Sequence, residues 1–157
     1  MSGASVALAA RVVLAGALVV SAVAKLRAPA EVRRRVGAIM SDRLGAFAGR
    51  GLPGVELAVA IALVVLWGPV PGVVALAMLA VFTVALVRAQ ARKVPCACFG
   101  AGASDAPPGA AAVVRNGVLA ALAVLAIGSP SGADAGPTIV WCLVFGAATT
   151  LAIRAAP

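Results

Sequence analysis

The covalent and metal chemistry that this sequence could perform is concentrated in one short segment, Cys96-Ala97-Cys98-Phe99-Gly100. Two cysteines separated by one residue hold their Cα atoms near the distance range that a disulfide permits. The ring closed by such a bridge is small, and a strained disulfide is more easily reduced than a structural one. We therefore expect Cys96 and Cys98 to form a redox pair, with Phe99 and Gly100 completing the motif.

Basic residues flank the cysteine pair along the chain. Arg92 and Lys93 precede it, and Arg115-Asn116 opens the next apolar segment. Nearby cations lower the pKa of a thiol and favour the nucleophilic thiolate. We expect these residues to support the pair, although Arg115 is equally explained as an anchor at the membrane boundary. Pro95 and Gly100 favour a non-helical loop, in which both sulfurs can face one way.

Other interpretations of the cysteines remain open. The pair could be two inert thiols, or it could bind a soft cation such as Cu(I) or Hg(II), which thiolates select. The chain offers few further soft ligands, and it has no histidine to complete a zinc site. The third cysteine, Cys142, is expected to be a small buried apolar residue that takes no part in the chemistry.

The composition excludes an ordinary soluble domain. Of the 157 residues, 63% are hydrophobic and 11% are charged, and the mean hydropathy is +1.11. Soluble domains are about 45–50% apolar and about 25% charged. The absence of histidine also excludes histidine-based acid–base catalysis, haem ligation by histidine and most zinc enzymes.

Apolar segments long enough to cross a bilayer predict an all-α polytopic membrane bundle with four or five transmembrane helices. Clusters of proline and glycine at 68–72 and 128–132 break the pattern between segments. The first segment also resembles a signal peptide, with Ala22-Val23-Ala24 as a cleavage site, which is why four spans compete with five. We expect one domain over 1–157, with spans at about 4–24, 52–67, 73–90, 108–127 and 137–153.

The charge distribution predicts the orientation. All lysines and arginines except Arg11 lie at 25–50, at 88–115 or at Arg154, and the breaks near 70 and 130 contain none. By the positive-inside rule, the N-terminus then lies outside, and the Cys-x-Cys loop and the C-terminus lie in the cytoplasm. The net charge of +8 therefore indicates the membrane rather than nucleic acid. Arg11 is expected to extend outward to the interface.

The segment from Pro29 to about Ala48 is too polar to span the membrane. Val32, Val36, Ile39 and Leu44 recur at roughly helical spacing, with arginines between them. This pattern predicts a short amphipathic helix on the inner leaflet. A solvated basic loop is the alternative.

Glu56 lies within the second apolar segment, and an ionisable residue there normally has a partner. Lys25, at the inner end of the first segment, lies at about the same depth, and Arg27 is the second choice. The predicted Lys25–Glu56 pair would tie the first two spans together. It could also line a quinone or proton site.

Four short motifs recur together in a known family. The chain resembles the MauE/DoxX family of redox-associated membrane proteins, in particular its MauE members, over roughly residues 5–155. The motifs are Lys25-Leu26-Arg27-x-Pro29, Pro53-x-x-Glu56, Cys96-x-Cys98-Phe99-Gly100 and Arg115-Asn116.

The resemblance implies a small helical bundle, related in outline to the quinone-linked vitamin K epoxide reductases. It implies a role in thiol–disulfide maturation of an exported protein, of the type needed by the methylamine dehydrogenase small subunit. A thioredoxin-like MauD protein is the implied partner, and Cys96 and Cys98 the implied redox pair. A non-catalytic scaffold subunit, alone or in an oligomer, is the rival.

The two lines of reasoning disagree on one point. Disulfide maturation takes place outside the cytoplasmic membrane, whereas the charge rule puts Cys96 and Cys98 at the inner face. Either the pair collects electrons from cytoplasmic or quinone donors, or the orientation is inverted. The charge rule favours the inner placement.

Overall fold

The computed structural model describes residues 3–95 and 107–128. Within these residues every regular element is a helix, which confirms the predicted all-α class. The helices are α1 (Gly3–Arg27), α2 (Pro29–Ile39), α3 (Asp42–Arg50), α4 (Leu52–Val65), α5 (Val70–Arg92) and α6 (Ala110–Ile127).

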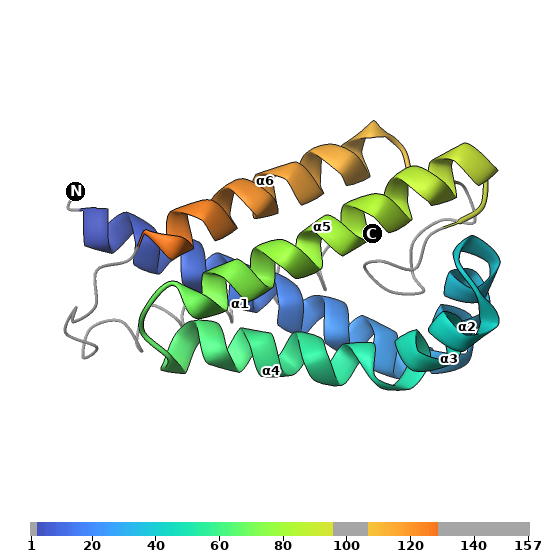
Figure 1. Ribbon diagram of the computed structural model, residues 1–157, viewed down its shortest axis with the longest axis horizontal. Coiled ribbons are helices and arrows are strands. Elements are labelled where there is room, and N and C mark those ends of the chain that lie inside the picture. The colour runs from blue at the N-terminus through green and yellow to red at the C-terminus, as the bar shows by residue number, and fades with distance from the viewer. Residues whose placement is uncertain (1–2, 96–106, 129–157) are drawn as a thin grey trace, which may run out of the picture.

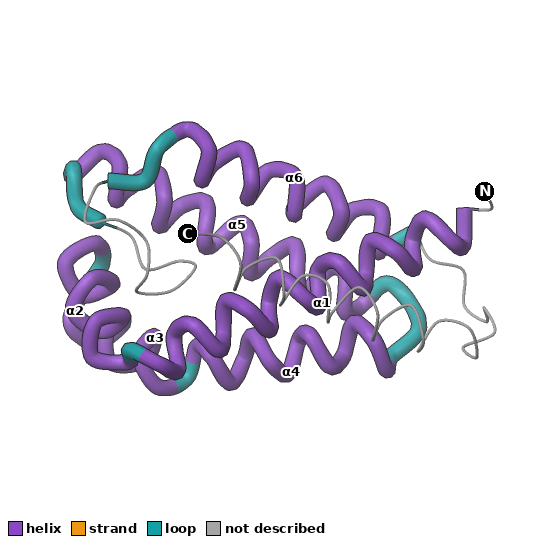
Figure 2. Tube along the Cα trace, turned by 180° about the vertical axis from the view of Figure 1, so that it is seen from behind, coloured by secondary structure: helices purple, strands orange, loops and turns teal. Residues whose placement is uncertain are grey.

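The long helices run roughly along one axis (Figure 1). Helix α1 packs along α4 and along α6, and α5 packs along α6. The short helices α2 and α3 form a hairpin at one end of the bundle, and α5 ends and α6 begins at that same end (Figures 1 and 2). The α4–α5 turn and the last turn of α6 lie at the opposite end. The sequence thus places nearly all described lysines and arginines at the hairpin end.

Three of the described helices are long and apolar enough to cross a membrane: Ala4–Arg27, Val70–Arg92 and Ala110–Ile127. A fourth crossing arises if α3 and α4, which are bent by 49° at their junction, count as one broken span. Alone, the 14 residues of α4 would extend only about 21 Å, against a hydrocarbon core of about 30 Å. The chain is therefore a helical membrane bundle, and the fifth predicted span, 137–153, lies outside the described residues.

The third span begins earlier than predicted, because the proline in its first turn was expected to belong to the preceding turn. The third span was expected from residue 73, but α5 begins at Val70 and includes Pro71 in its first turn. A proline is tolerated there because the N–H groups of a first turn have no helical partner. The turn between α4 and α5 is correspondingly short.

The core lies where α1, α4, α5 and α6 meet. Large buried side chains come from each helix: Leu14 and Leu18 from α1, Leu63 from α4, Leu79 from α5 and Leu119 from α6. Small residues separate them, including Ala60, Ala75 and Ala123, and this lets the helix backbones approach closely.

The prediction of one amphipathic helix over residues 29–48 is wrong, because the segment forms two helices. The chain breaks at Met40-Ser41, and the Ser41 hydroxyl accepts a hydrogen bond from the Leu44 backbone N–H at 3.4 Å. Ser41 is thus the N-cap of α3, a position that serine favours. The break turns Leu44 away from the buried Val32 and Ile39, so Leu44 is 49% exposed.

Two glycines of α3 allow it to pack closely against α2. A Cβ atom on Gly45 would lie 2.5 Å from the carbonyl oxygen of Arg33 and 2.9 Å from the backbone nitrogen of Gly37. One turn later, a Cβ on Gly49 would lie 2.8 Å from the carbonyl oxygen of Pro29. All three neighbouring atoms belong to the backbone, so they cannot rotate away as the end of a side chain could.

We therefore expect Gly45→Ala to lower the thermal unfolding midpoint, because the added methyl group forces α2 and α3 apart. Overpacking of this kind costs about 1–3 kcal/mol. Gly117→Ala is the matched control, because nothing lies within 4 Å of a Cβ at this position in α6. It should leave the midpoint unchanged or raise it, since alanine favours a helix by about 0.5–1 kcal/mol. Equal midpoints for the two variants would contradict the tight hairpin.

Candidate functional site

A buried ion pair joins α1 to α4 at the hairpin end. Nζ of Lys25 lies 2.6 Å from Oε1 of Glu56, and the two side chains are 1% and 0% exposed. The hydroxyl of Ser21 donates to the same Glu56 oxygen at 3.0 Å and accepts from Lys25 at 2.5 Å. The pair expected from the sequence is therefore present, with Lys25 rather than Arg27 as the partner.

One residue of this site was missed from the sequence. Ser21 lies one helical turn before Lys25, on the same face of α1, so the i, i+4 spacing could have indicated it. Phe82 of α5 covers the other side of the lysine, with its ring centroid 5.2 Å from Nζ. The ammonium thus has a carboxylate, a hydroxyl and an aromatic face around it.

A second buried cation, Arg11, lies near the other end of α1. The prediction that it extends outward is wrong, because Arg11 is 2% exposed. Its guanidinium donates to the carbonyl oxygens of Leu66 at 2.8 Å, Gly68, and Ala126 at 3.3 Å. Leu66 and Ala126 lie at the C-terminal ends of α4 and α6, where the last turn leaves oxygens without helical partners and the helix dipole is negative, and Gly68 lies in the turn that follows α4. Arg11 therefore caps two helices at once.

Asn116 lies between α5 and α6 and is 1% exposed. Its Nδ2 donates to the carbonyl oxygen of Leu79 at 3.0 Å and to the hydroxyl of Thr83 at 2.6 Å. The Thr83 hydroxyl in turn donates to the same Leu79 carbonyl at 2.9 Å. The structure thus makes Asn116 part of the α5–α6 contact, whereas the adjacent Arg115 is exposed.

Two of the basic residues expected to support the cysteines, Arg92 and Lys93, lie at the C-terminal end of α5. Arg92 donates through Nη1 to the carbonyl oxygen of Ala38 at 2.9 Å, so it caps α2. Lys93 closes α5 in the left-handed conformation, with φ 54°, and its N–H group bonds to the carbonyls of Ala89 and Gln90. This cap ends the helix immediately before Val94 and Pro95. Cys96, Cys98, Phe99, Gly100 and Cys142 lie outside the described residues, so their predicted roles remain predictions.

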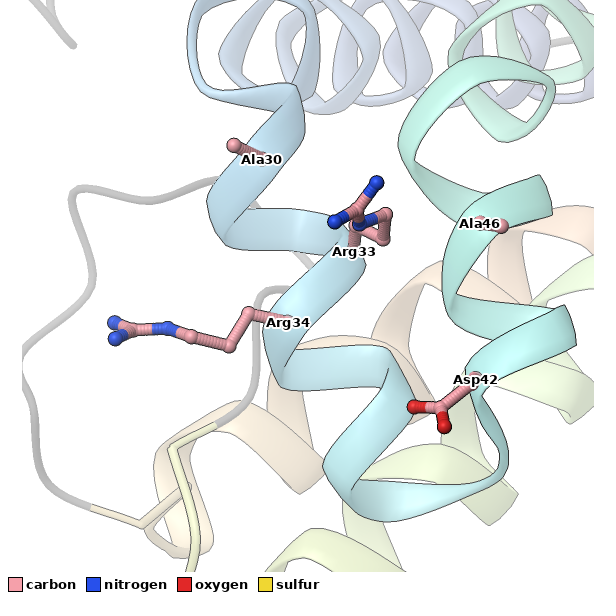
Figure 3. A pocket seen from close by; sticks show the side chains of 5 residues that line it. All are labelled: Ala30, Arg33, Arg34, Asp42 and Ala46. Carbon is pink, nitrogen blue, oxygen red and sulfur yellow. The ribbon is translucent and has the colours of Figure 1, made fainter.

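A cationic groove opens between α2 and α3 on the surface of the hairpin (Figure 3). Its volume is about 530 Å³, and its walls include Arg33, Arg34 and Asp42. Arg34 points away from α3, while the Asp42 carboxylate lies at the start of α3 (Figure 3). Hydrogen bonds from Arg34 and from Arg35 hold the pKa of Glu31 on α2 below its ordinary value. The groove is open to its surroundings and carries both arginine and aspartate side chains. Such charged side chains can lie at the polar surface of a membrane.

The described part of the site thus provides charge but no thiol. Lysine, glutamate and serine meet inside the bundle at the end where α5 leads toward the cysteine segment. No cluster of three or more histidine, cysteine, aspartate or glutamate side chains occurs within 3–95 and 107–128. Any thiol chemistry must therefore come from the segment that follows Pro95.

The chain matches a known protein family over most of its length. The family described as methylamine utilisation protein MauE matches residues 3–129 of this chain. Comparisons with curated proteins and with solved structures gave no match. Since the matched region contains every helix from α1 to α6 and most of the sequence, the chain belongs to the MauE family of membrane proteins.

Proposed function

We propose that this protein supports thiol–disulfide maturation of an exported protein, with Cys96 and Cys98 as its redox pair. The observation that carries the proposal is the Cys-x-Cys motif in a member of the MauE family. Two structural features add support. Helix α5 ends in a fixed cap at Lys93, two residues before Pro95, and the buried Lys25–Glu56 pair lies at the same end of the bundle.

The chemistry balances within the cysteine pair and its partner. One thiolate attacks a disulfide of a thioredoxin-like protein and forms a mixed disulfide, which releases one thiolate of the partner. The second cysteine of the pair then attacks and releases the other partner thiolate. The Cys96–Cys98 disulfide that results has given two electrons to the partner, and the reverse sequence restores the dithiol.

We expect Cys96 and Cys98 to change together from dithiol to disulfide as the redox potential is raised. The purified protein is equilibrated in redox buffers and then alkylated with a mass-tagged reagent that marks free thiols. Cys142→Ser should leave a shift of two tags, whereas Cys96→Ser or Cys98→Ser should abolish it. Either of the latter variants should also trap a mixed disulfide with a thioredoxin-like partner.

The same experiment separates the rival functions. A pair that stays reduced under strong oxidant contradicts the redox proposal. Stoichiometric binding of Cu(I) or Hg(II) that needs both cysteines would then indicate a soft-metal site. An unchanged cellular phenotype in the double serine variant would indicate a scaffold subunit without thiol chemistry.

We propose further that the protein lies in the cell membrane with its hairpin end in the cytoplasm. The support is the concentration of arginine on α2, α3 and the last turns of α5, and its absence from the α4–α5 turn. In this orientation the cysteine pair would exchange electrons with cytoplasmic or membrane-dissolved donors.

The two ends of α5 provide a matched test of this orientation. In a cysteine-free background, Ala91→Cys marks the hairpin end and Pro69→Cys marks the opposite end, and both positions are exposed. We expect a membrane-impermeant thiol reagent to label position 69 in intact cells, and position 91 only after permeabilisation. The reverse pattern would invert the bundle and place the cysteine pair on the side where exported proteins mature.

A further inference from the structure

An apolar cavity of about 200 Å³ opens between the α2–α3 hairpin and α5. Apolar side chains from all three helices form its walls, among them Val36, Met40, Leu44, Phe47, Val81 and Ala85. Lys25 also borders the cavity, but its ammonium is buried and is held by Glu56 and Ser21. The walls therefore offer a ligand hydrocarbon contacts rather than hydrogen bonds.

The cavity opens toward the lipid-facing surface of the bundle. Leu44, Phe47 and Val81 of its walls are 49%, 58% and 58% exposed, respectively. Large apolar side chains on the outside of a membrane bundle lie against acyl chains. An apolar cavity of about 150 Å³ in another protein holds the six carbons of benzene, so the present cavity has room for a segment of one acyl chain.

A cation lies at one end of the cavity. Arg88 follows Ala85 by three residues on α5, so the two side chains share a face of the helix. Nη1 of Arg88 donates to Sδ of Met40, which also lines the cavity, at 3.5 Å. A thioether sulfur is a weak acceptor and takes one of the five N–H donors of a guanidinium. The exposed Arg88 can therefore also bind a phosphate.

A second arginine, Arg43, lies beside the cavity on α3. It is exposed and precedes Phe47 by four residues, so it lies on the same face of the helix. The carboxylates of the hairpin are engaged elsewhere. Glu31 is paired with two arginines of α2, and Asp42 lines the cationic groove on the side that α3 turns toward α2 (Figure 3). The mouth of the cavity is therefore complementary to an anion.

The order of these groups along α5 matches a phospholipid in one leaflet. Val81 and Arg88 are seven residues apart in sequence, which is about 10 Å along a helix axis. Arg88 is the nearer of the two to the hairpin end, where α5 ends at Arg92 (Figure 1). The cation thus lies toward the membrane surface and the apolar wall toward the bilayer centre, as the phosphate and the acyl chains of a lipid do.

We propose that this end of the bundle binds one anionic phospholipid from the leaflet on the hairpin side. One acyl chain occupies the cavity between the hairpin and α5, and the phosphate is bound by Arg88 and Arg43. The site is independent of the proposed function, because it needs neither the cysteines nor a particular orientation of the bundle. The bound lipid links α3 to α5.

The test is native mass spectrometry of the full-length protein released from detergent micelles. Phosphatidylglycerol is compared with phosphatidylcholine that carries the same palmitoyl and oleoyl chains and is neutral overall. We expect one phosphatidylglycerol per protein, bound at least about fivefold more tightly than phosphatidylcholine, since one arginine near an anionic lipid contributes roughly that factor. Equal affinity for the two lipids would overturn the proposal.

The phosphate contact is tested with Arg88→Gln, which should lower the affinity for phosphatidylglycerol about fivefold and leave that for phosphatidylcholine unchanged. Arg33→Gln is the matched control, because Arg33 is exposed on the same hairpin but lines the cationic groove instead of the cavity. It should bind phosphatidylglycerol as the unmodified protein does. Equal losses in the two variants would indicate general attraction to a basic surface and would overturn the site.

The acyl-chain contact is tested by filling the cavity. Ala85→Phe fills it from α5 and should abolish one-to-one binding of phosphatidylglycerol. Val36→Phe fills it from α2, which keeps the test valid if the first variant folds poorly. Ala80→Phe is the matched control on α5, because Ala80 is exposed and does not line the cavity, and it should bind normally.

Glycerol 3-phosphate separates a lipid site from a site for free phosphate, because it carries the anionic group without the chains. It should not displace phosphatidylglycerol at equal concentration. Displacement would overturn the proposal and indicate a site for soluble phosphate compounds. Undiminished lipid binding in both Ala85→Phe and Val36→Phe would overturn it too, since it would show that no chain enters the cavity.

Discussion

Replacement of Glu56 by glutamine is expected to lower the stability of the bundle by about 3–5 kcal/mol, the range for breaking a buried ion pair. The change leaves the Lys25 ammonium, which is 1% exposed, without its carboxylate. Lys25→Met should have a comparable effect, since it leaves the carboxylate buried. The measurement is the midpoint of thermal unfolding in detergent micelles, followed by circular dichroism.

The decisive comparison is between the stability of the double variant Lys25→Met, Glu56→Met and that of each single variant. Removing both charges eliminates two desolvation penalties, so part of the lost stability should return. Asp42→Asn is the control for the exchange of a carboxylate for an amide, because Asp42 is exposed on α3. Its effect should stay below about 1 kcal/mol. A double variant that is less stable than either single one would show that the two residues act independently.

The other large effect is expected for Arg11→Met, which should lower the free energy of unfolding by about 2–4 kcal/mol. The guanidinium supplies charged hydrogen bonds to carbonyls at the ends of α4 and α6, and buried acceptors left without donors cost about 1–3 kcal/mol each. The stability of Arg11→Lys should lie between that of the unmodified protein and that of Arg11→Met, because an ammonium cannot donate to carbonyls that lie as far apart. The same thermal midpoint measures both variants.

Arg27→Met is the matched control for Arg11, since it makes the same change at an exposed position on the same helix. Its effect should stay within about 0.5 kcal/mol. A further readout is hydrogen exchange at the last turns of α4 and α6, which should quicken in Arg11→Met and remain unchanged in Arg27→Met. Unchanged exchange in the Arg11 variant would contradict the capping role.

Much of the fold could be predicted from the sequence because a bilayer imposes simple rules. An apolar run of sufficient length becomes a helix, and this placed α1, α5 and α6. A carboxylate inside such a run requires a cation at its own depth, and this led to Lys25 and Glu56. The break between α2 and α3 was also present in the sequence, since Ser41-Asp42 is a helix start signal. It was hidden because Leu44 continues the apolar spacing of Val32, Val36 and Ile39 across the break.

The partners of the arginines could not be predicted. Arg11 bonds to backbone carbonyls of residues 52 to 115 positions away, and Arg92 bonds to the carbonyl of Ala38. A backbone carbonyl exists at every position, so the sequence carries no signal of which one will serve as acceptor. Only the assembled bundle brings those helix ends beside the cations.

The placement of Arg11 and Lys25 on one helix has a consequence for how the protein is made. Helix α1 leaves the ribosome before α4 and α6 and carries both cations, and one charged residue at the centre of a span costs about 2.5–3.5 kcal/mol on translocon insertion scales. Glu56 follows Lys25 by 31 residues, and the Ala126 carbonyl follows Arg11 by 115. Helix α1 thus enters the bilayer before the groups that bond to its two cations have been synthesised. Helix α4 then supplies Glu56 for Lys25, and α6 later supplies the Ala126 carbonyl for Arg11, so synthesis and stabilisation proceed in the same order.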